Sequence, residues 1–122
     1  MESQPTYQPI REHQRFKAKQ RALVLLPQGE DALPYHIIDI SQGGLSFRYL
    51  GKKLKHAEIN SISLYHEYDL IVDALPVTTV SDSRLHDNLV PVRRGSIRFN
   101  SLNPDQRERL TTFIQQHTET SH

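Results

Sequence analysis

Two short groups of residues in this sequence have side chains suited to holding a ligand. The first is a pair of arginines, Arg11 and Arg15, separated by three residues. On a helical turn they would share one face, and on an irregular arm both could fold towards the same ligand. A guanidinium group is planar, permanently charged and bidentate, so the pair suits phosphates and the edge or face of guanine. A solvated basic arm would show the same spacing, because such short motifs often match by chance.

The second group lies in the stretch 39–47, DISQGGLSF. An apolar run over 35–40 leads into it, and strict alternation over 45–49 follows it. Two adjacent glycines permit positive φ and a tight reversal. We therefore expect a β-hairpin with Asp39, Ser41 and open glycine backbone gathered at its turn. Turns commonly use Asp, Ser and Gly, so this stretch alone does not separate a ligand-binding turn from a plain one.

The elements that must position these groups are mostly short strands. Alternating or β-branched apolar residues predict strands over 21–27, 33–40, 45–50, 57–66, 68–75 and 90–99, with an extended segment at 77–80. Pro76 is expected to interrupt the chain between two of them, and the polar run 81–88 is expected to be a loop. Several short strands followed by one helix favour a small antiparallel barrel with the helix laid against it.

A helix is predicted over 103–117. Asn103 suits the N-cap, Pro104 suits the first helical position, and Gln106 stands where a capping box requires it. One apolar stripe then follows at i, i+3 and i+4: Leu110, Phe113 and Ile114. The whole chain is expected to comprise a flexible tail (1–9) and one domain (10–118), made of a mobile basic arm (10–20), the barrel (21–100) and this helix.

The composition is that of an ordinary soluble domain, with 36% hydrophobic and 24% charged residues in 122. A net charge of +1 does not indicate a nonspecific binder of nucleic acid or membrane. An OB-like barrel for single-stranded nucleic acid would need stacking aromatics along a basic groove, which this sequence does not offer. No signal peptide and no apolar run of membrane-spanning length is found, so we expect a cytoplasmic protein without membrane insertion.

Patterns of catalytic and metal-binding residues are missing from the sequence. The chain has no cysteine, which removes disulfides, thiolate metal sites and a Cys nucleophile. Its seven histidines form no HxxxH or HxH pair, and Ser41 does not stand in a GxSxG motif. Asp69 and Asp73 would share a strand face, yet two surface carboxylates are far more often solvated than catalytic. We therefore expect no enzyme, no metal and no cofactor.

Taken together, the arginine spacing RxxxR and the later DxSxxG resemble the two-part signature of the PilZ domain family. The resemblance runs from about Ile10 to Thr118 and includes RRGSIRFNSLNPDQRERL, which is similar to the family's closing strand and helix. It implies an all-β fold with a C-terminal helix, in the form of a six-stranded antiparallel PilZ-like β-barrel. The stretch 52–69 is less typical of the family.

The family's founding activity is binding the bacterial second messenger cyclic di-GMP, and the resemblance implies the same ligand here. Arg11 and Arg15 would clamp its guanines and phosphates. Asp39 would accept hydrogen bonds from the guanine N1–H and exocyclic amine, a donor pair that adenine lacks. Ser41 would donate its hydroxyl to the ligand. Gly44 would let the backbone approach where a Cβ would collide.

Three further residues bear on this implied site. Ile10 stands where some family members carry another arginine and bind a stacked pair of ligands, so the apolar residue favours one ligand per domain. Arg93 and Arg94 could approach the ligand or cover the barrel, and the structural role is favoured for both.

The resemblance thus implies a cytoplasmic bacterial receptor that binds cyclic di-GMP and no nucleic acid. Ordering of the arm 10–20 by the ligand would relay the signal to a downstream effector protein. The alternative is a PilZ-like protein–protein adaptor that binds no nucleotide. Adaptors of that kind typically lack the arginine pair or the Asp/Ser pair, and this sequence has both.

Overall fold

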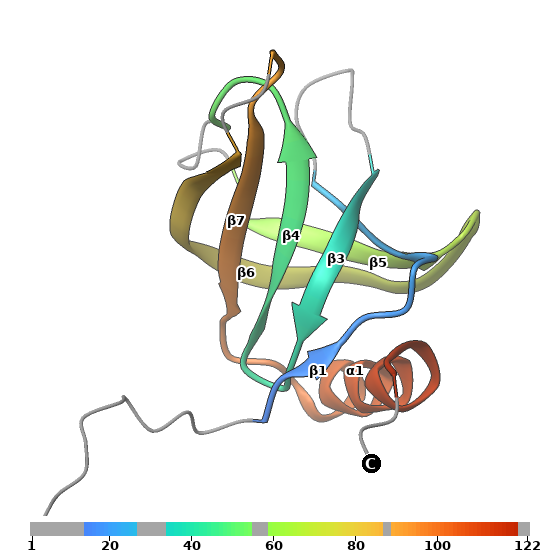
Figure 1. The fold of residues 1–122 in the computed structure, drawn as a ribbon. Coiled ribbons are helices and arrows are strands. Elements are labelled where there is room, and N and C mark those ends of the chain that lie inside the picture. Colours follow the sequence, from blue (N-terminus) through green and yellow to red (C-terminus); the bar gives the residue numbers. More distant parts are fainter. Residues whose placement is uncertain (1–13, 27–33, 55–58, 87–88, 120–122) are drawn as a thin grey trace, which may run out of the picture.

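The computed structural model describes residues 14–26, 34–54, 59–86 and 89–119, which form a β-barrel with one helix across its end (Figure 1). The elements are β1 (Phe16–Lys17), β2 (Ala22–Leu25), β3 (Pro34–Ile40), β4 (Gly44–Leu50), β5 (Ser61–His66), β6 (Asp69–His86), β7 (Val92–Phe99) and α1 (Pro104–His117). The predicted tail 1–9 and the first residues of the predicted arm, Ile10 and Arg11 among them, lie outside the described residues.

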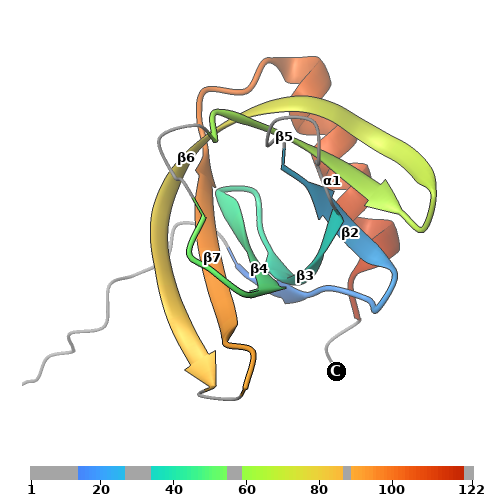
Figure 2. The same cartoon turned by 90° about the horizontal axis from the view of Figure 1, so that it is seen from above.

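Six strands close the barrel in the order β3-β2-β5-β6-β7-β4, because β3 also pairs with β4. All pairings are antiparallel, and Figure 2 shows the closed ring from above. The short strand β1 adds to β3 beyond β2, with Phe16 opposite Ile40 and Lys17 opposite Asp39. The predicted six-stranded antiparallel barrel with a C-terminal helix is confirmed.

Alternation along β4 shows how the sequence divides inside from outside. Leu45, Phe47 and Tyr49 point into the barrel and are almost fully buried, whereas Arg48 and Leu50 are exposed. The rings of Phe47 and Tyr49 pack together with centroids 5.7 Å apart. The core that these side chains build is continuous with the underside of the helix.

The predictions for the middle of the chain were wrong in one respect. Pro76 does not end a strand, and the described part of the predicted loop 81–88 is extended, so β6 is a single strand of 18 residues. The strand changes partner at this point, since Pro76 pairs with Ser61 of β5 and Val77 with Phe99 of β7. A proline tolerates such a corner because its carbonyl still accepts a bond, here from the Asn100 N–H at 2.9 Å.

Helix α1 begins as predicted. The Asn103 side chain accepts the Gln106 N–H at 2.7 Å, and the Gln106 side chain accepts the Asn103 N–H at 2.9 Å. Its apolar stripe is buried against the barrel: Leu110, Phe113 and Ile114. Within the described residues, α1 is the sole helix, and it is neither long nor apolar enough to cross a membrane.

The end of α1 is tied to the segment that contains β1. The Lys19 N–H donates to the His117 carbonyl and the Glu119 N–H to the Lys17 carbonyl, both at 2.8 Å. The His117 ring also stacks on the ring of His66 from β5, with centroids 4.5 Å apart. The start of the barrel and the last turn of the helix therefore form one connected region.

Candidate functional site

The outer surface of β3 and β4 carries an aspartate that a regular strand would have turned inwards. A β-bulge between Ile37 and Asp39 adds one residue to β3 relative to β4. Ile37 and Ile40 consequently both enter the core, where they are 5% and 0% exposed. Asp39 faces outwards opposite Ser46 of β4. The bulge thus places a carboxylate on an otherwise ordinary barrel wall.

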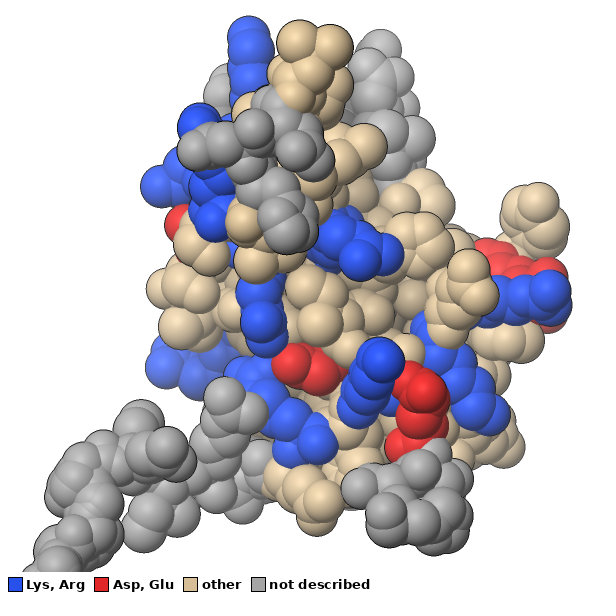
Figure 3. All heavy atoms as spheres, viewed as in Figure 1, with Lys and Arg blue, Asp and Glu red and all other residues tan. Residues whose placement is uncertain are grey.

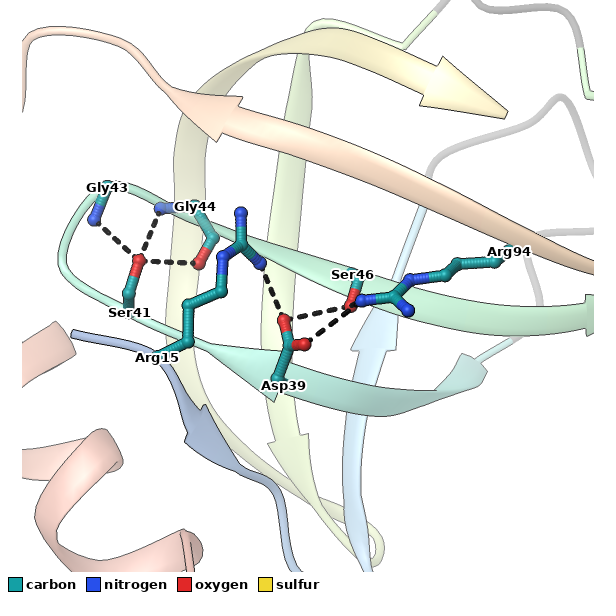
Figure 4. Close-up of polar contacts among 7 residues, drawn as sticks. All are labelled: Arg15, Asp39, Ser41, Gly43, Gly44, Ser46 and Arg94. Atoms are coloured by element: carbon teal, nitrogen blue, oxygen red, sulfur yellow. Dashed lines mark hydrogen bonds and ion pairs between the residues drawn. The ribbon is translucent and has the colours of Figure 1, made fainter. Parts of the chain in front are cut away.

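Three donors from three separate strands or segments converge on this carboxylate (Figure 4). Arg15 Nη1 lies 2.6 Å from Asp39 Oδ1, and Arg94 Nη2 of β7 lies 3.1 Å from Oδ2. The Ser46 hydroxyl donates to Oδ1 at 2.9 Å and accepts from Arg94 at 3.1 Å. Two guanidinium groups thus surround one partly buried carboxylate, so this spot carries excess positive charge suited to an anion.

The predicted hairpin turn is present beside this cluster, and the Ser41 hydroxyl is hydrogen-bonded within it. Ser41 is 3% exposed, and its hydroxyl oxygen accepts the N–H groups of Gly43 and Gly44 at 3.1 and 3.3 Å (Figure 4). The Ser41 N–H donates to the Gly44 carbonyl at 2.8 Å. The hydroxyl is therefore engaged within the turn and holds the two glycine amides in place.

Gly44 is required for a packing reason. Among the described glycines, positive φ occurs at Gly51 and not in this turn, so the tight reversal forms without the positive φ that the two glycines permit. A Cβ at position 44 would instead collide with the backbone carbonyl of Ile97 in β7. The close approach that the glycine allows in this structure is between β4 and β7.

Further cations lie on the same side of the barrel, on strands β4 and β7. Arg48 pairs in register with Arg94, and Arg98 pairs with Gly44; both Arg48 and Arg98 are exposed. Figure 3 shows basic side chains distributed over this face, with acidic ones between them. Next to Asp39, a groove of about 480 Å³ runs between β1 and β3, lined by Lys17, Ala18, Lys19, Gln20, His36, Ile37, Ile38, Arg48 and Glu119.

Of the residues expected to form the site, Arg15 and Asp39 are in direct contact, and Ser41 and Gly44 form the adjacent turn. Arg11 lies outside the described residues. Ser46 was not predicted as a member of the cluster, and for Arg94, which joins it, the structural role had been favoured over an approach to the ligand. Ser46 lies opposite Asp39 because of the bulge in β3, and Arg94 lies near it because β7 pairs with β4. Neither arrangement can be read from the order of residue types in the sequence.

Arg93 has the structural role that was expected of it. Its Nε donates to Asp82 of β6 at 2.8 Å and to the Tyr49 hydroxyl at 3.2 Å. The Tyr49 hydroxyl in turn donates to Asp82. Burial first, and then the hydrogen bond to Asp82, raise the pKa of Tyr49 above its ordinary value. This buried network joins β4, β6 and β7 at the end of the barrel remote from α1.

Comparisons with known proteins bear on the family and the fold of the chain. A family model described as the PilZ domain matches residues 9–116, and no match was found among curated proteins. The structure is similar to "PilZ domain with c-di-GMP of YcgR from Escherichia coli", at 19% identity and a TM-score of 0.62, covering 86% of this chain and 88% of that one.

Two longer proteins are similar over part of their length. The K. pneumonia MrkH–c-di-GMP complex has 16% identity and a TM-score of 0.67, covering 87% of this chain and 51% of MrkH. The Borreliella burgdorferi PlzA protein in complex with c-di-GMP has 16% identity and a TM-score of 0.54, covering 87% and 49%. The chain therefore spans about half of these proteins, and at such identities the likeness establishes the fold.

Proposed function

The chain belongs to the PilZ domain family, and we propose that it is a receptor for cyclic di-GMP. The observation that carries the proposal is the convergence of Arg15 and Arg94 on Asp39, beside the turn that Ser41 holds in place. Two cations and a carboxylate acceptor are what a guanine dinucleotide with two phosphodiesters requires. Several structures similar to this one were solved with c-di-GMP.

In the proposed complex, Asp39 accepts the N1–H and exocyclic amine of a guanine. Its carboxylate already accepts bonds from Arg15, Ser46 and Arg94, so the base must displace at least one of these donors. Arg15 is the donor that can leave, because it precedes a strand of only two residues, whereas Ser46 and Arg94 stand on long strands. The released guanidinium, together with Arg11, would then clamp a phosphate or stack on the base.

Ser41 and Gly44 support the site from the turn. Because the Ser41 hydroxyl accepts two glycine amides, its main proposed contribution is to keep that backbone open towards the ligand. Gln42 fastens the same turn to α1 by donating to the Thr111 hydroxyl at 2.7 Å. The turn thus forms the rigid half of the proposed site.

The arm supplies the output in this proposal. Exchange of Arg15 from Asp39 to the ligand would reorder the segment 10–20, and the changed surface would be read by a downstream effector protein. We place this non-enzymatic receptor in the bacterial cytoplasm, with residues 10–118 as its domain. An Asp39 acceptor pairs with guanine and not with adenine, so cyclic di-AMP should bind far more weakly.

Isothermal titration with cyclic di-GMP tests the proposal. We expect binding tighter than ~100 μM, a constant that corresponds to about 5 to 6 kcal/mol. Arg15→Ala should remove most of this binding and leave the melting temperature nearly unchanged. Arg109→Ala is the matched control, because it removes a guanidinium group that is 61% exposed on α1 and pairs with Asp105 of the same helix. Absence of binding would favour the nucleotide-free adaptor.

A further inference from the structure

The end of the barrel opposite α1 exposes a group of large apolar side chains. Seven such side chains are exposed in the described residues, and four of them come from this end: Leu50, Leu85, Leu89 and Val90. Leu89 is 102% exposed and Leu50 is 65% exposed, so both project into solvent. Figure 1 shows the hairpin between β6 and β7 at the top of the molecule, far from the helix. We call these four residues the apolar tip.

The tip rests on a firmly bonded base. Leu50 pairs with Val92 in the ladder between β4 and β7, and the Gly51 N–H donates to the Pro91 carbonyl at 2.9 Å. Beneath it lies the buried network of Tyr49, Asp82 and Arg93. Exposure of the tip is therefore a property of the folded barrel and does not require a segment to open.

The described surroundings of the tip are mainly basic. Arg48, Lys52, Lys53 and Arg84 are all exposed there. In the described residues 48–54, 81–86 and 89–94 the single acidic residue is Asp82, and its side chain is 1% exposed, while Asp87 lies outside the described residues. Figure 3 shows basic side chains gathered around this upper end of the barrel. The formal charge of +1 for the whole chain hides this local excess.

The exposed leucines and the lysines beside them together indicate what kind of partner the apolar tip can bind. A fully exposed leucine at this end of the barrel suits a soft apolar layer more than a fitted pocket. Lysines beside it can place their ammonium groups among anionic headgroups while their methylenes lie along the apolar boundary. An acidic protein surface would satisfy the lysines but would leave the protruding leucine in contact with polar groups.

We propose that the apolar tip and the cations around it bind the surface of a bilayer that contains anionic lipid. The association is peripheral: the apolar tip enters the headgroup boundary, and no described segment spans the membrane. In this orientation α1, at the opposite end of the barrel, faces away from the lipid. Asp39 and its neighbours, on the barrel wall, stay accessible to a water-soluble ligand.

Co-sedimentation of the full chain with vesicles tests this proposal. Equal mixtures of phosphatidylcholine and phosphatidylglycerol should bind the protein at low salt at least about tenfold more tightly than phosphatidylcholine alone. Leu89→Asp should abolish this binding. The double variant Lys52→Glu, Lys53→Glu should weaken it by about 25-fold or more, since each lysine near an anionic surface contributes about fivefold. All these side chains are exposed, so the melting temperatures should not change.

Tyr68→Asp is the matched control. Tyr68 is 95% exposed on the turn between β5 and β6, outside the tip, so its variant should bind vesicles like the parent. Failure of the parent to bind the mixed vesicles would overturn the proposal and leave the tip to a protein partner. Retention of binding by Leu89→Asp would overturn it as well, because adsorption would then be electrostatic alone.

Discussion

Arg93 and Arg94 are neighbours in the sequence, yet their side chains leave β7 on opposite sides of the barrel wall. Arg93 donates to the buried carboxylate of Asp82, at 2.8 Å, and is 12% exposed. Arg94 reaches Asp39 on the outer face, at 3.1 Å, and is 38% exposed. The alternation of a β-strand thus divides two identical residues between one buried pair and the candidate site around Asp39.

Arg94→Ala should lower the affinity for cyclic di-GMP by about tenfold or more, because a charge-assisted hydrogen bond that orients Asp39 is lost. The melting temperature should stay close to that of the parent, since the Arg94 side chain is partly exposed. Titration calorimetry and thermal unfolding measure the two quantities. Arg94→Lys serves as a control for charge alone and should recover part of the affinity. Unchanged binding in Arg94→Ala would remove this residue from the site.

Asp82→Asn should destabilise the fold without touching the ligand face. The substitution leaves Arg93 without its buried carboxylate, and breaking a pair of this kind lowers the free energy of unfolding by about 3 kcal/mol. Chemical denaturation measures this loss. The control is Asp105→Asn, whose pair with Arg109 on α1 is 73% and 61% exposed, and it should change stability by less than about 0.5 kcal/mol. Equal effects of the two would contradict a structural role for the buried network.

Gly44→Ala should destabilise the barrel by about 3 kcal/mol, because the new methyl group meets the Ile97 carbonyl and must push β4 from β7. Gly51→Ala is the comparison: nothing lies near its Cβ, but φ is +99°, so the loss should be about 1 kcal/mol. Urea unfolding of both variants measures the difference. A Gly44→Ala protein as stable as the parent but unable to bind cyclic di-GMP would show instead that the glycine serves the ligand.

The stability of the fold should fall as the pH drops below about 6.5. Burial, followed by the nearby His66 and Lys19, lowers the pKa of His117 from its ordinary value of 6.5. The unfolded chain then binds the proton more readily than the folded one, so stability is complete above pH 6.5 and declines until the folded pKa is reached. Denaturation midpoints across this range should slope less in His117→Gln than in the parent.

The sequence was most informative where a local rule decides the structure. Asn103, Pro104 and Gln106 predict the start of α1 because a capping box depends on side chains three residues apart. The bulge that turns Asp39 outwards could not be predicted, since it depends on where β3 meets β4. The prediction that Pro76 interrupts the strand was wrong for the same reason. The proline is tolerated because β6 changes its partner strand there, and the residues around Pro76 do not indicate that change.

The residues of the candidate site also divide into those that a local motif predicts and those that the fold alone brings together. Arg15 and Asp39 belong to motifs with a readable spacing, and the structure brings them together. Arg94 reaches the same carboxylate only because β7 closes the ring beside β4. Its partner lies 55 residues away in the chain, a separation at which spacing carries no information.

The hydrogen bonds between the β1 segment and the end of α1 should open before the rest of the fold unfolds. Lys19 and Gln116, which are hydrogen-bonded there, stand 97 residues apart, and closing a loop of that length opposes folding by about 4 kcal/mol from chain entropy. Once folded, a two-residue strand at the edge of the sheet opens more easily than the strands inside the ring. The amides of Lys19 and Glu119 should therefore exchange their hydrogens sooner than those inside the barrel. Arg15 lies on this early-opening segment, so a ligand that holds Arg15 would slow the exchange at the far end of the chain.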